Sequence, residues 1–503
     1  MKGPLFGNTR NVGASTLEIL IAFAVLFLTM SAVVMIVFGN QSIATDTQTS
    51  NEALGKAHNI LEDARALSKK NYLNIVSTSS SELAGPLAYT TTLTVTDLTQ
   101  CKKQATSMVS WVSGSRTLSV ELGSFLTDIT GALALGGDCP PDPPAYALWK
   151  SPDTLNSADF IPSDISATDI DVKNKIAFMS GATSSANAPD FFIFDARLAS
   201  SVAPPALSWS LDTGGGLNAV DAIDGMDGNY YIFAANNDLA LSPLKQLVVL
   251  REPKDLGTAP ILIASSTLPG VSGSCPISCP QGRSVYYYAP YVYVGAHRAG
   301  GKEFHIFDVS NPAAPVWKGS IELNTNVNDI MVKDQLVGGV AKRIAYLAIA
   351  GNAKDLELLD VTNPTAISVY TSMNVGGTQD AEVVYALGTT VYIGKDRSAS
   401  GPDLFAVNVF NPSAPQVLGS ADIPMKPGAA VMGLRVVGQL AFVGTTDSTD
   451  PFQVWDVSNP ASMSRWDTST YDFAEKILDL DYEDGRVYTA SQPNDALRII
   501  YAP

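Results

Sequence analysis

The first pattern along the chain is a long apolar run that continues into an amphipathic segment. Residues 1–13 are polar, and from Leu17 to Phe38 the only charged residue is Glu18. Beyond this run, apolar residues recur every three or four positions as far as Leu67. This periodicity predicts one helix from about residue 15 to residue 70. At about 1.5 Å per residue, its apolar part is long enough to span the roughly 30 Å hydrocarbon layer of a membrane.

Three segments with alternating, strand-type composition follow the predicted helix. Residues 89–98, 103–112 and 116–126 are rich in Thr, Val and aromatic residues. This composition predicts a three-stranded antiparallel sheet, which needs the back half of the helix to cover one face. We therefore expect a small domain over 71–139. The proline-rich residues 140–145 then form a stiff connector.

From residue 146 onward the chain repeats itself. The segment Phe-His-Ile-Phe-Asp-Val-Ser-Asn-Pro at 304–312 has close copies later in the chain, and weaker copies begin at 191, 247 and 497, which gives seven. The close copies carry marker residues spaced by 52, 48 and 48 positions, namely Asp308, Asp360, Asn408 and Asp456. About four strands fit in each period of roughly 50 residues, which is the size of one propeller blade. The repeat therefore predicts a seven-bladed β-propeller over 146–503.

The marker residues and the closing strand have structural roles in this prediction. Asp or Asn followed by Asn-Pro is typical turn chemistry, so the markers are expected to form the turn between the third and fourth strands of a blade. The last copy ends without a fourth strand. Residues 146–151 are similar to the fourth strand of the blade that contains Asp308, and we expect them to complete the last blade and close the ring.

Composition and charge limit the function. The 503 residues are 46% hydrophobic and carry a net charge of −17. Such an acidic chain is not expected to bind nucleic acid, which requires clustered Lys and Arg.

The cysteines indicate an oxidising compartment. Four cysteines allow three pairings, of which we favour the local one, Cys275 with Cys279 and Cys101 with Cys139. None of the three histidines lies at metal-ligand spacing to a cysteine pair, so no metal site is predicted.

No motif for catalysis is present. The chain has no nucleophile elbow, phosphate loop or zinc motif, so we expect no catalytic residue and no enzyme activity. Two acidic clusters have the composition of turns, with calcium binding as the alternative: Asp221, Asp224 and Asp227, and then Asp479, Asp481, Glu483 and Asp484. The aromatic stretch from Tyr286 to Tyr293 alternates like a core strand, with a ligand-binding face as the alternative.

The N-terminus resembles a known processing signal. Gly13 is followed by Ala14, and Glu18 stands four positions after Ala14 at the start of the apolar run. This arrangement is similar to the class III signal peptide of type IV prepilins and pseudopilins. The resemblance implies that prepilin peptidase removes residues 1–13, that Ala14 becomes the methylated N-terminus, and that Glu18 pairs with a neighbouring subunit during assembly. Residues 14–70 would then be the transmembrane and assembly helix.

The repeat resembles the LVIVD repeat of bacterial surface propellers. Together, the two resemblances imply a fold of a long N-terminal α-helix with a small antiparallel α+β pilin-like domain, followed by an all-β seven-bladed propeller. The implied function is a minor pilin or pseudopilin that displays a propeller at the cell surface for adhesion or ligand binding. The implied partners are other pilin subunits, prepilin peptidase, the inner membrane before assembly and a surface ligand, with no cofactor. The alternative is a membrane-anchored surface propeller, a binding protein or a hydrolase or lyase, that does not polymerise.

Overall fold

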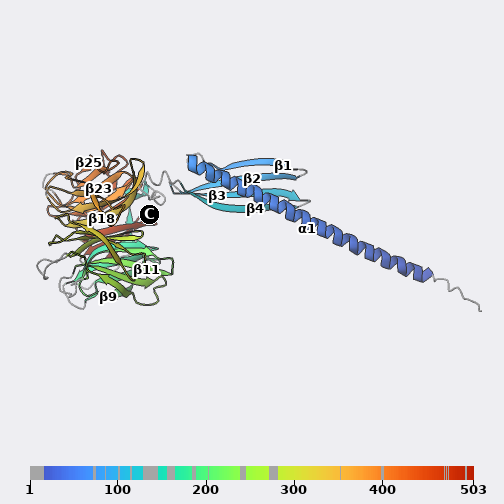
Figure 1. Cartoon of the computed structure of the whole chain (residues 1–503), viewed down its shortest axis with the longest axis horizontal. Coiled ribbons are helices and arrows are strands. Elements are labelled where there is room, and N and C mark those ends of the chain that lie inside the picture. Colours follow the sequence, from blue (N-terminus) through green and yellow to red (C-terminus); the bar gives the residue numbers. More distant parts are fainter. Residues whose placement is uncertain are drawn as a thin grey trace, which may run out of the picture. The chain divides into compact units, whose positions relative to one another are not determined.

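The computed structural model describes the chain in two compact units. The described residues are 16–71, 75–84, 87–99, 102–113, 116–127, 146–155, 165–183, 188–201, 203–237, 245–270, 281–298, 300–351, 353–397, 401–468, 471, 473, 475–492 and 496–502. Figure 1 shows the helix and sheet of the first unit and the blades of the second.

The first unit combines one helix with one sheet. Helix α1 (Thr16–Asn71) lies against an antiparallel sheet in the order β1 (Thr78–Ala84), β2 (Leu87–Thr99), β3 (Lys102–Ser113) and β4 (Arg116–Thr127). Small helix residues such as Ala53 and Ala57 pack on Tyr89, Val109 and Trp111. Small side chains let the helix approach the sheet closely, so the large rings fill the interface. Among the residues whose side chains are described, no helix is long and apolar enough to cross a membrane.

The expected fold class is corrected in this first unit. The side chains of α1 are described mainly over two stretches, 23–36 and 46–68, and the sheet has four strands instead of three. The additional strand, β1, is rich in serine and lacks the apolar alternation of a half-buried strand. It forms because its hydroxyl groups match those of β2, as in the 2.7 Å contact between Ser80 Oγ and Thr91 Oγ1. The structure is therefore a set of eight four-stranded sheets across the described residues, one in this unit and seven in a propeller, and not a pilin-like α+β domain of three strands.

The second unit is a seven-bladed propeller. Each blade is a four-stranded antiparallel sheet whose first strand contacts the first strands of its neighbours and so lies innermost. The blades, from inner to outer strand, are β6 (Ile165–Lys173), β7 (Ile176–Thr183), β8 (Phe191–Asp195), β9 (Ala206–Leu211); β10 (Leu217–Asp224), β11 (Asn229–Asn236), β12 (Leu247–Pro253), β13 (Ile261–Ser266); β14 (Gly282–Tyr288), β15 (Tyr291–Ala296), β16 (Phe304–Asp308), β17 (Val316–Ile321); β18 (Val327–Val337), β19 (Val340–Ile349), β20 (Leu356–Asp360), β21 (Ser368–Met373); β22 (Ala381–Leu387), β23 (Thr390–Lys395), β24 (Leu404–Asn408), β25 (Gln416–Ala421); β26 (Val431–Val437), β27 (Leu440–Thr445), β28 (Phe452–Asp456), β29 (Ser464–Arg465); and β30 (Lys476–Glu483), β31 (Arg486–Gln492), β32 (Leu497–Tyr501) with β5 (Asp153–Thr154).

The core of the propeller lies between the blades. The third strands are buried on both faces, as in Phe191-Phe-Ile-Phe, because each face packs on a different neighbouring blade. This arrangement explains why the third strands are continuous apolar runs, whereas the outer strands, such as β17, are only partly buried. We number the blades 1 to 7 in the order just given, so blade 7 is the one completed by β5.

The ring is closed by a segment from the start of the unit, but not by the residues expected. The closing strand is β5, in which Thr154 and Asp153 pair with Ile500 and Tyr501, and the prediction that 146–151 forms this strand is wrong. Residues Leu148–Lys150 form a 3₁₀ turn instead. This turn buries Trp149 against Phe442, with ring centroids 4.6 Å apart. Burial of the large indole outweighs the few hydrogen bonds that an edge strand here would gain.

Candidate functional site

A β-bulge recurs at one position in every inner strand of the propeller. In each pairing of first and second strands the register shifts by one residue, as between Ala167 and Asp169 in blade 1. A bulge leaves one residue unpaired and re-aims its side chain. The seven unpaired residues all line the central channel, and they are Thr168, Asn218, Arg283, Asn328, Glu382, Met432 and Leu478.

The channel is a cavity of about 580 Å³ with a mixed polar and apolar lining, built from successive layers of inner-strand residues. Alternate residues of a strand point to the same side, so each second residue after the bulge contributes to the next layer. The lining holds three cationic side chains, Lys173, Arg283 and Arg435. It also holds seven carboxylates, namely Asp169, Asp171, Asp221, Asp329, Glu382, Asp479 and Asp481. The channel is therefore acidic.

The channel carboxylates cap backbone groups of the neighbouring blade. The inner strand lies at the edge of its blade, so the N–H groups that point away from its own sheet have no partner strand to bond to. Asp171 Oδ2 accepts a hydrogen bond from the Ala222 N–H at 2.7 Å, and Asp221 Oδ2 accepts one from the Tyr287 N–H at 2.6 Å. Equivalent bonds join Asp169 to Val220, Asp329 to Val384, Asp479 to Ile170 and Asp481 to Val172. These aspartates thus hold the blades together from inside the ring.

Burial and mutual repulsion shift the proton affinities in the channel. Burial raises the pKa of Asp171 and of Asp329 to about 6. Burial, with nearby carboxylates adding to it, also raises the pKa values of Asp221 and Asp479. Burial acts in the same direction on Asp481, but Arg435 and Lys173 outweigh it and lower the pKa of that carboxyl. The channel consequently contains carboxyl groups whose pKa values are raised beside one, Asp481, whose pKa is lowered.

One group of three carboxylates beside the channel is close enough to hold a metal ion. Oxygen atoms of Asp380, Glu382 and Asp396 lie within 4.8 Å of one another. Arg283 Nη2 lies 3.4 Å from Glu382 Oε2, and Asp380 Oδ1 accepts a bond from the Gly351 N–H at 2.9 Å. Burial and the two neighbouring aspartates raise the pKa of Glu382 to about 7, against the opposing effect of Arg283. Two of the three carboxylates therefore already have protein partners.

The predicted marker residues form side-chain-stabilised turns at the ends of the third strands. Asp308 Oδ1 accepts the Ser310 N–H at 3.0 Å. The equivalent bonds are Asp360 to Thr362, Asn408 to Phe410 and Asp456 to Ser458. The asparagine three positions later repeats the device, for example Asn311 Oδ1 with the Ala313 N–H at 3.2 Å. These contacts are those of consecutive Asx turns.

The acidic cluster that includes Asp221 does not converge on one point. Asp221 faces the channel, Asp224 forms an ion pair with Lys254, and Asp227 accepts a bond from the Tyr231 hydroxyl at 2.6 Å.

The second acidic cluster is divided in the same way. Asp479 and Asp481 line the channel, whereas Glu483 binds backbone N–H groups of blade 1 and Asp484 lies 3.5 Å from Lys175. Neither cluster forms the calcium site considered as the alternative.

The aromatic stretch is divided between core and surface. Tyr293 is fully buried, Tyr287 stacks on Phe233 with centroids 5.5 Å apart, and Tyr286 lines the channel. The guanidinium of Arg343 lies 4.6 Å from the ring centroid of Tyr288. The stretch therefore mostly packs within the blades, as its alternation indicates.

A second repeated polar position was not recognised in the sequence. The residue directly before the third strand is a buried acid or amide in five blades, namely Asp190, Gln246, Glu303, Asp355 and Asp403. Its side chain mostly accepts backbone N–H groups from the loop that leaves the fourth strand, as Glu303 does from Leu323 at 2.7 Å. The signal was present, since each of these residues immediately precedes an aligned apolar run.

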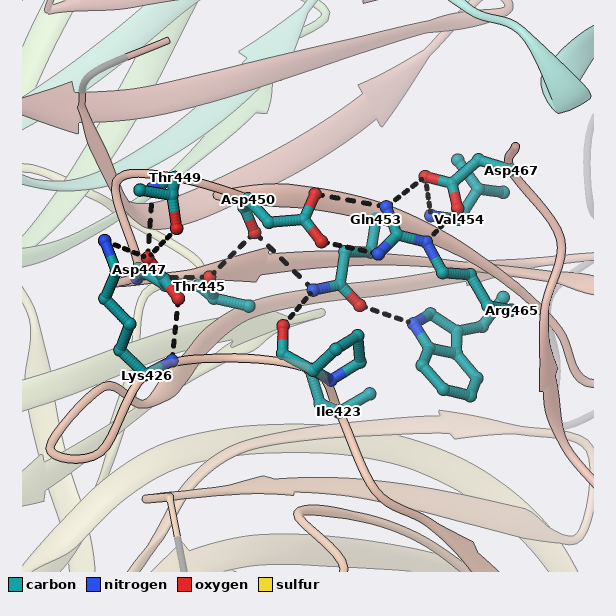
Figure 2. Close-up of polar contacts among 12 residues, drawn as sticks. Ile423, Lys426, Thr445, Asp447, Thr449, Asp450, Gln453, Val454, Arg465 and Asp467 are labelled. Carbon is teal, nitrogen blue, oxygen red and sulfur yellow. Dashed lines mark hydrogen bonds and ion pairs between the residues drawn. The ribbon is translucent and has the colours of Figure 1, made fainter. Parts of the chain in front are cut away.

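Blade 6 replaces this device with a buried ion network, which Figure 2 shows. The guanidinium of Arg465 lies between Asp450 and Asp467 and contacts both carboxylates. Asp447 Oδ2 accepts the Lys426 N–H at 2.7 Å in the adjacent loop. The network fixes loops at the end of the blade where the outer strand β29 has only two residues.

Several predicted residues lie outside the described part of the chain. These are Gly13 and Ala14, the side chain of Glu18, and all four cysteines, Cys101, Cys139, Cys275 and Cys279.

Comparison with known proteins gives the repeat its family. The model of the LVIVD repeat matches residues 282–322 and 428–467, which contain blade 3 and blade 6. The propeller carries LVIVD repeats. No curated protein sequence matches the chain.

Solved structures similar to the LVIVD propeller share little sequence with it. The BBS1N chain of a complex with ARL6DN is 14% identical, with 70% of this chain and 98% of that chain covered and a TM-score of 0.42. A quinonprotein alcohol dehydrogenase-like protein from Bacteroides thetaiotaomicron is 11% identical, with 78% and 91% covered and a TM-score of 0.38. A protein of unknown function from Desulfotomaculum acetoxidans is 12% identical, with 72% and 96% covered and a TM-score of 0.38.

Proposed function

We propose that this chain is a minor subunit of a type IV pilus-like filament and carries the LVIVD propeller as a binding head at the cell surface. The observation that carries the proposal is the apolar N-terminal part of α1. Eleven large apolar side chains from Ile21 to Ile36 are 47–76% exposed. A continuous exposed apolar surface of this kind marks an interaction with lipid or protein.

Self-assembly of this helix accounts both for its apolar surface and for Glu18, the one charged residue within the apolar run. Glu18 stands at the start of the apolar run, where an unpaired carboxylate is costly in a membrane or a packed filament. Pairing with the freed amino group of Ala14 on a neighbouring subunit would remove that cost. The partners are then prepilin peptidase, which cuts after Gly13, the inner membrane before assembly, and other pilin subunits afterwards.

The propeller supports binding better than catalysis. Of the seven channel carboxylates, six accept backbone N–H groups of the next blade, and Glu382 contacts Arg283. Groups held in this way serve the ring and are poorly placed to move protons for a substrate. The acidic surface, which follows from the net charge of −17, favours cationic or neutral surface ligands over nucleic acid.

Substitution of Glu18 by Ala tests the assembly role. We expect Glu18→Ala to lower the amount of this chain in sheared surface filaments at least tenfold, measured by quantitative mass spectrometry, while the total cellular amount stays within twofold. Asp63→Ala is the matched control, because Asp63 is an exposed carboxylate further along the same helix. Unchanged incorporation of the Glu18 variant would contradict the filament role and favour an anchored propeller that does not polymerise.

A further inference from the structure

The segment that enters the propeller, residues 146–155, is held mainly by blades 6 and 7. We call it the strap. Trp466 Nε1 donates to Tyr146 O at 2.9 Å, and the Thr468 N–H donates to Lys150 O at 3.0 Å. Trp149 is buried in a cluster formed by blades 6 and 7. Its closing strand adds only two residue pairs to β32.

The joint between blades 7 and 1 is built from other residues. Its hydrophobic core combines residues of both blades, such as Ile170, Phe194, Leu497 and Ile499, and Leu155 is the one strap residue in it among those described. Hydrophobic burial at this joint therefore depends little on the strap.

The same joint also carries the longest series of carboxylate caps in the described ring. Three residues of β30, Asp479, Asp481 and Glu483, point toward blade 1 at successive alternate positions, and we call them the latch. Asp479 accepts the Ile170 N–H at 3.3 Å and Asp481 accepts the Val172 N–H at 2.9 Å. Glu483 accepts two N–H groups at 2.7 and 2.6 Å, those of Asn174 and Lys175. The bonds accepted by Asp481 and Glu483 are shorter than 3.0 Å, as expected of charge-assisted bonds to backbone N–H groups, which are among the stronger protein hydrogen bonds.

We propose that the propeller is closed in two separable stages, so that the strap can detach while the latch and the blade 7–blade 1 core keep the ring shut. The first unit precedes residue 146 in the chain, so any pull from that unit reaches the propeller through the strap. That a pull acts on the strap rests on the proposed surface display, in which the bound ligand and the anchored helix pull in opposite directions. The strap then acts as a releasable tether that protects the ring.

Amide hydrogen exchange of the purified full-length chain tests the two stages. The amides of Leu155 and Thr468 report on the strap, because they bond to Ile499 O and Lys150 O. The amide of Val172 reports on the latch, and the amide of Ile170, which also donates to Asp169 Oδ1 at 2.8 Å, reports on the same joint between blades 7 and 1. At low urea concentrations we expect the strap amides to exchange through an opening at least tenfold more populated than the opening that exposes the latch amides. Equal exchange of both sets would overturn the proposal.

Two variants separate the stages further. Trp149→Ala should accelerate the strap amides at least tenfold, while the amides of Ile170 and Val172 still exchange at least tenfold more slowly than the strap amides. Glu483→Ala should do the reverse, with faster exchange at Asn174 and Lys175 and no change in the strap. Leu148→Ala is the control, since Leu148 is 47% exposed in the same turn. If Trp149→Ala does not fold at all, the strap is indispensable and the proposal is wrong.

Because the readout is exchange within the propeller, it does not depend on filament assembly. If strap and latch exchange separately but Glu18→Ala is incorporated into filaments unchanged, the two-stage closure stands and only the proposed display is rejected.

Discussion

Glu252 gives the sharpest test of the electrostatics of the propeller. It lies on β12, is fully buried, and neither carboxyl oxygen has a hydrogen-bond partner. Burial, with a smaller contribution from Asp255, raises the pKa of Glu252 from 4.5 to about 8. The folded chain therefore favours the neutral acid, whereas the unfolded chain ionises near the ordinary value.

The sign of the resulting pH dependence follows from proton binding. Between the unfolded pKa of 4.5 and the folded pKa of about 8, the native state holds one more proton at this site than the unfolded state. The contribution of Glu252 to the free energy of unfolding is therefore fully present below pH 4.5 and is lost as the pH rises to 8, at about 1.4 kcal/mol per pH unit. Over the range from pH 5 to pH 8 the loss amounts to about 4 kcal/mol.

Glu252→Gln removes the titration and keeps the shape of the side chain. We expect urea denaturation to show similar stabilities for wild type and variant at pH 5, and a variant that is more stable by several kcal/mol at pH 8.5. Glu322→Gln, at an exposed position of the same unit, should follow the wild type at every pH. A stability difference between Glu252→Gln and wild type that does not change between pH 5 and pH 8.5 would refute the assignment of a buried, unpaired carboxyl.

Three further predictions concern packing and turns. Trp149→Ala should lower the free energy of unfolding by about 3–5 kcal/mol, against under 1 kcal/mol for the half-exposed Leu148→Ala, as measured by urea denaturation. Gly394→Ala should destabilise the propeller by about 1–3 kcal/mol, because the new methyl would meet Val431 and lie 2.7 Å from Val383 Cγ1, whereas Gly123→Ala, with open space around it, should change the thermal midpoint little. Asp308→Ala should lower the free energy of unfolding, measured by urea denaturation, by about 1 kcal/mol because it removes the bonds to Ser310. Asp308→Asn should recover most of the loss because its amide oxygen can replace the acceptor.

The propeller could be predicted from the sequence because its blades are defined by local chemistry. The Asp-Val-Ser-Asn-Pro turn joins residues two positions apart, for example Asp308 and Ser310, and so repeats as readable letters. The third strands are also recognisable in the sequence, because each is buried on both faces and is therefore a continuous run of mostly apolar residues. The strand β1 was missed because a strand held by hydroxyl pairs has no apolar alternation.

The channel could not be predicted from the sequence, because its contacts join distant residues. The bond from the Ile170 N–H to Asp479 spans 309 positions, and that from the Ala222 N–H to Asp171 spans 51. In the sequence, Asp479 and Asp481 look like part of an acidic turn. Only closure of the ring shows that they face the unpaired edge of the first blade, where a carboxylate is the acceptor that this edge needs.

The strap shows why similar local sequence does not fix the environment. Leu148-Trp-Lys-Ser in the strap is similar to Val316-Trp-Lys-Gly-Ser in β17, and the likeness predicted an outer strand at both places. Trp317 in β17 is 42% exposed, whereas Trp149 is 1% exposed. The difference arises because β29 of blade 6 has only two residues, which leaves room for an indole between blades 6 and 7. The tryptophan is thus a surface residue where a full outer strand exists and an anchor where the strand is short, so its role is decided by the length of another strand more than 300 positions away.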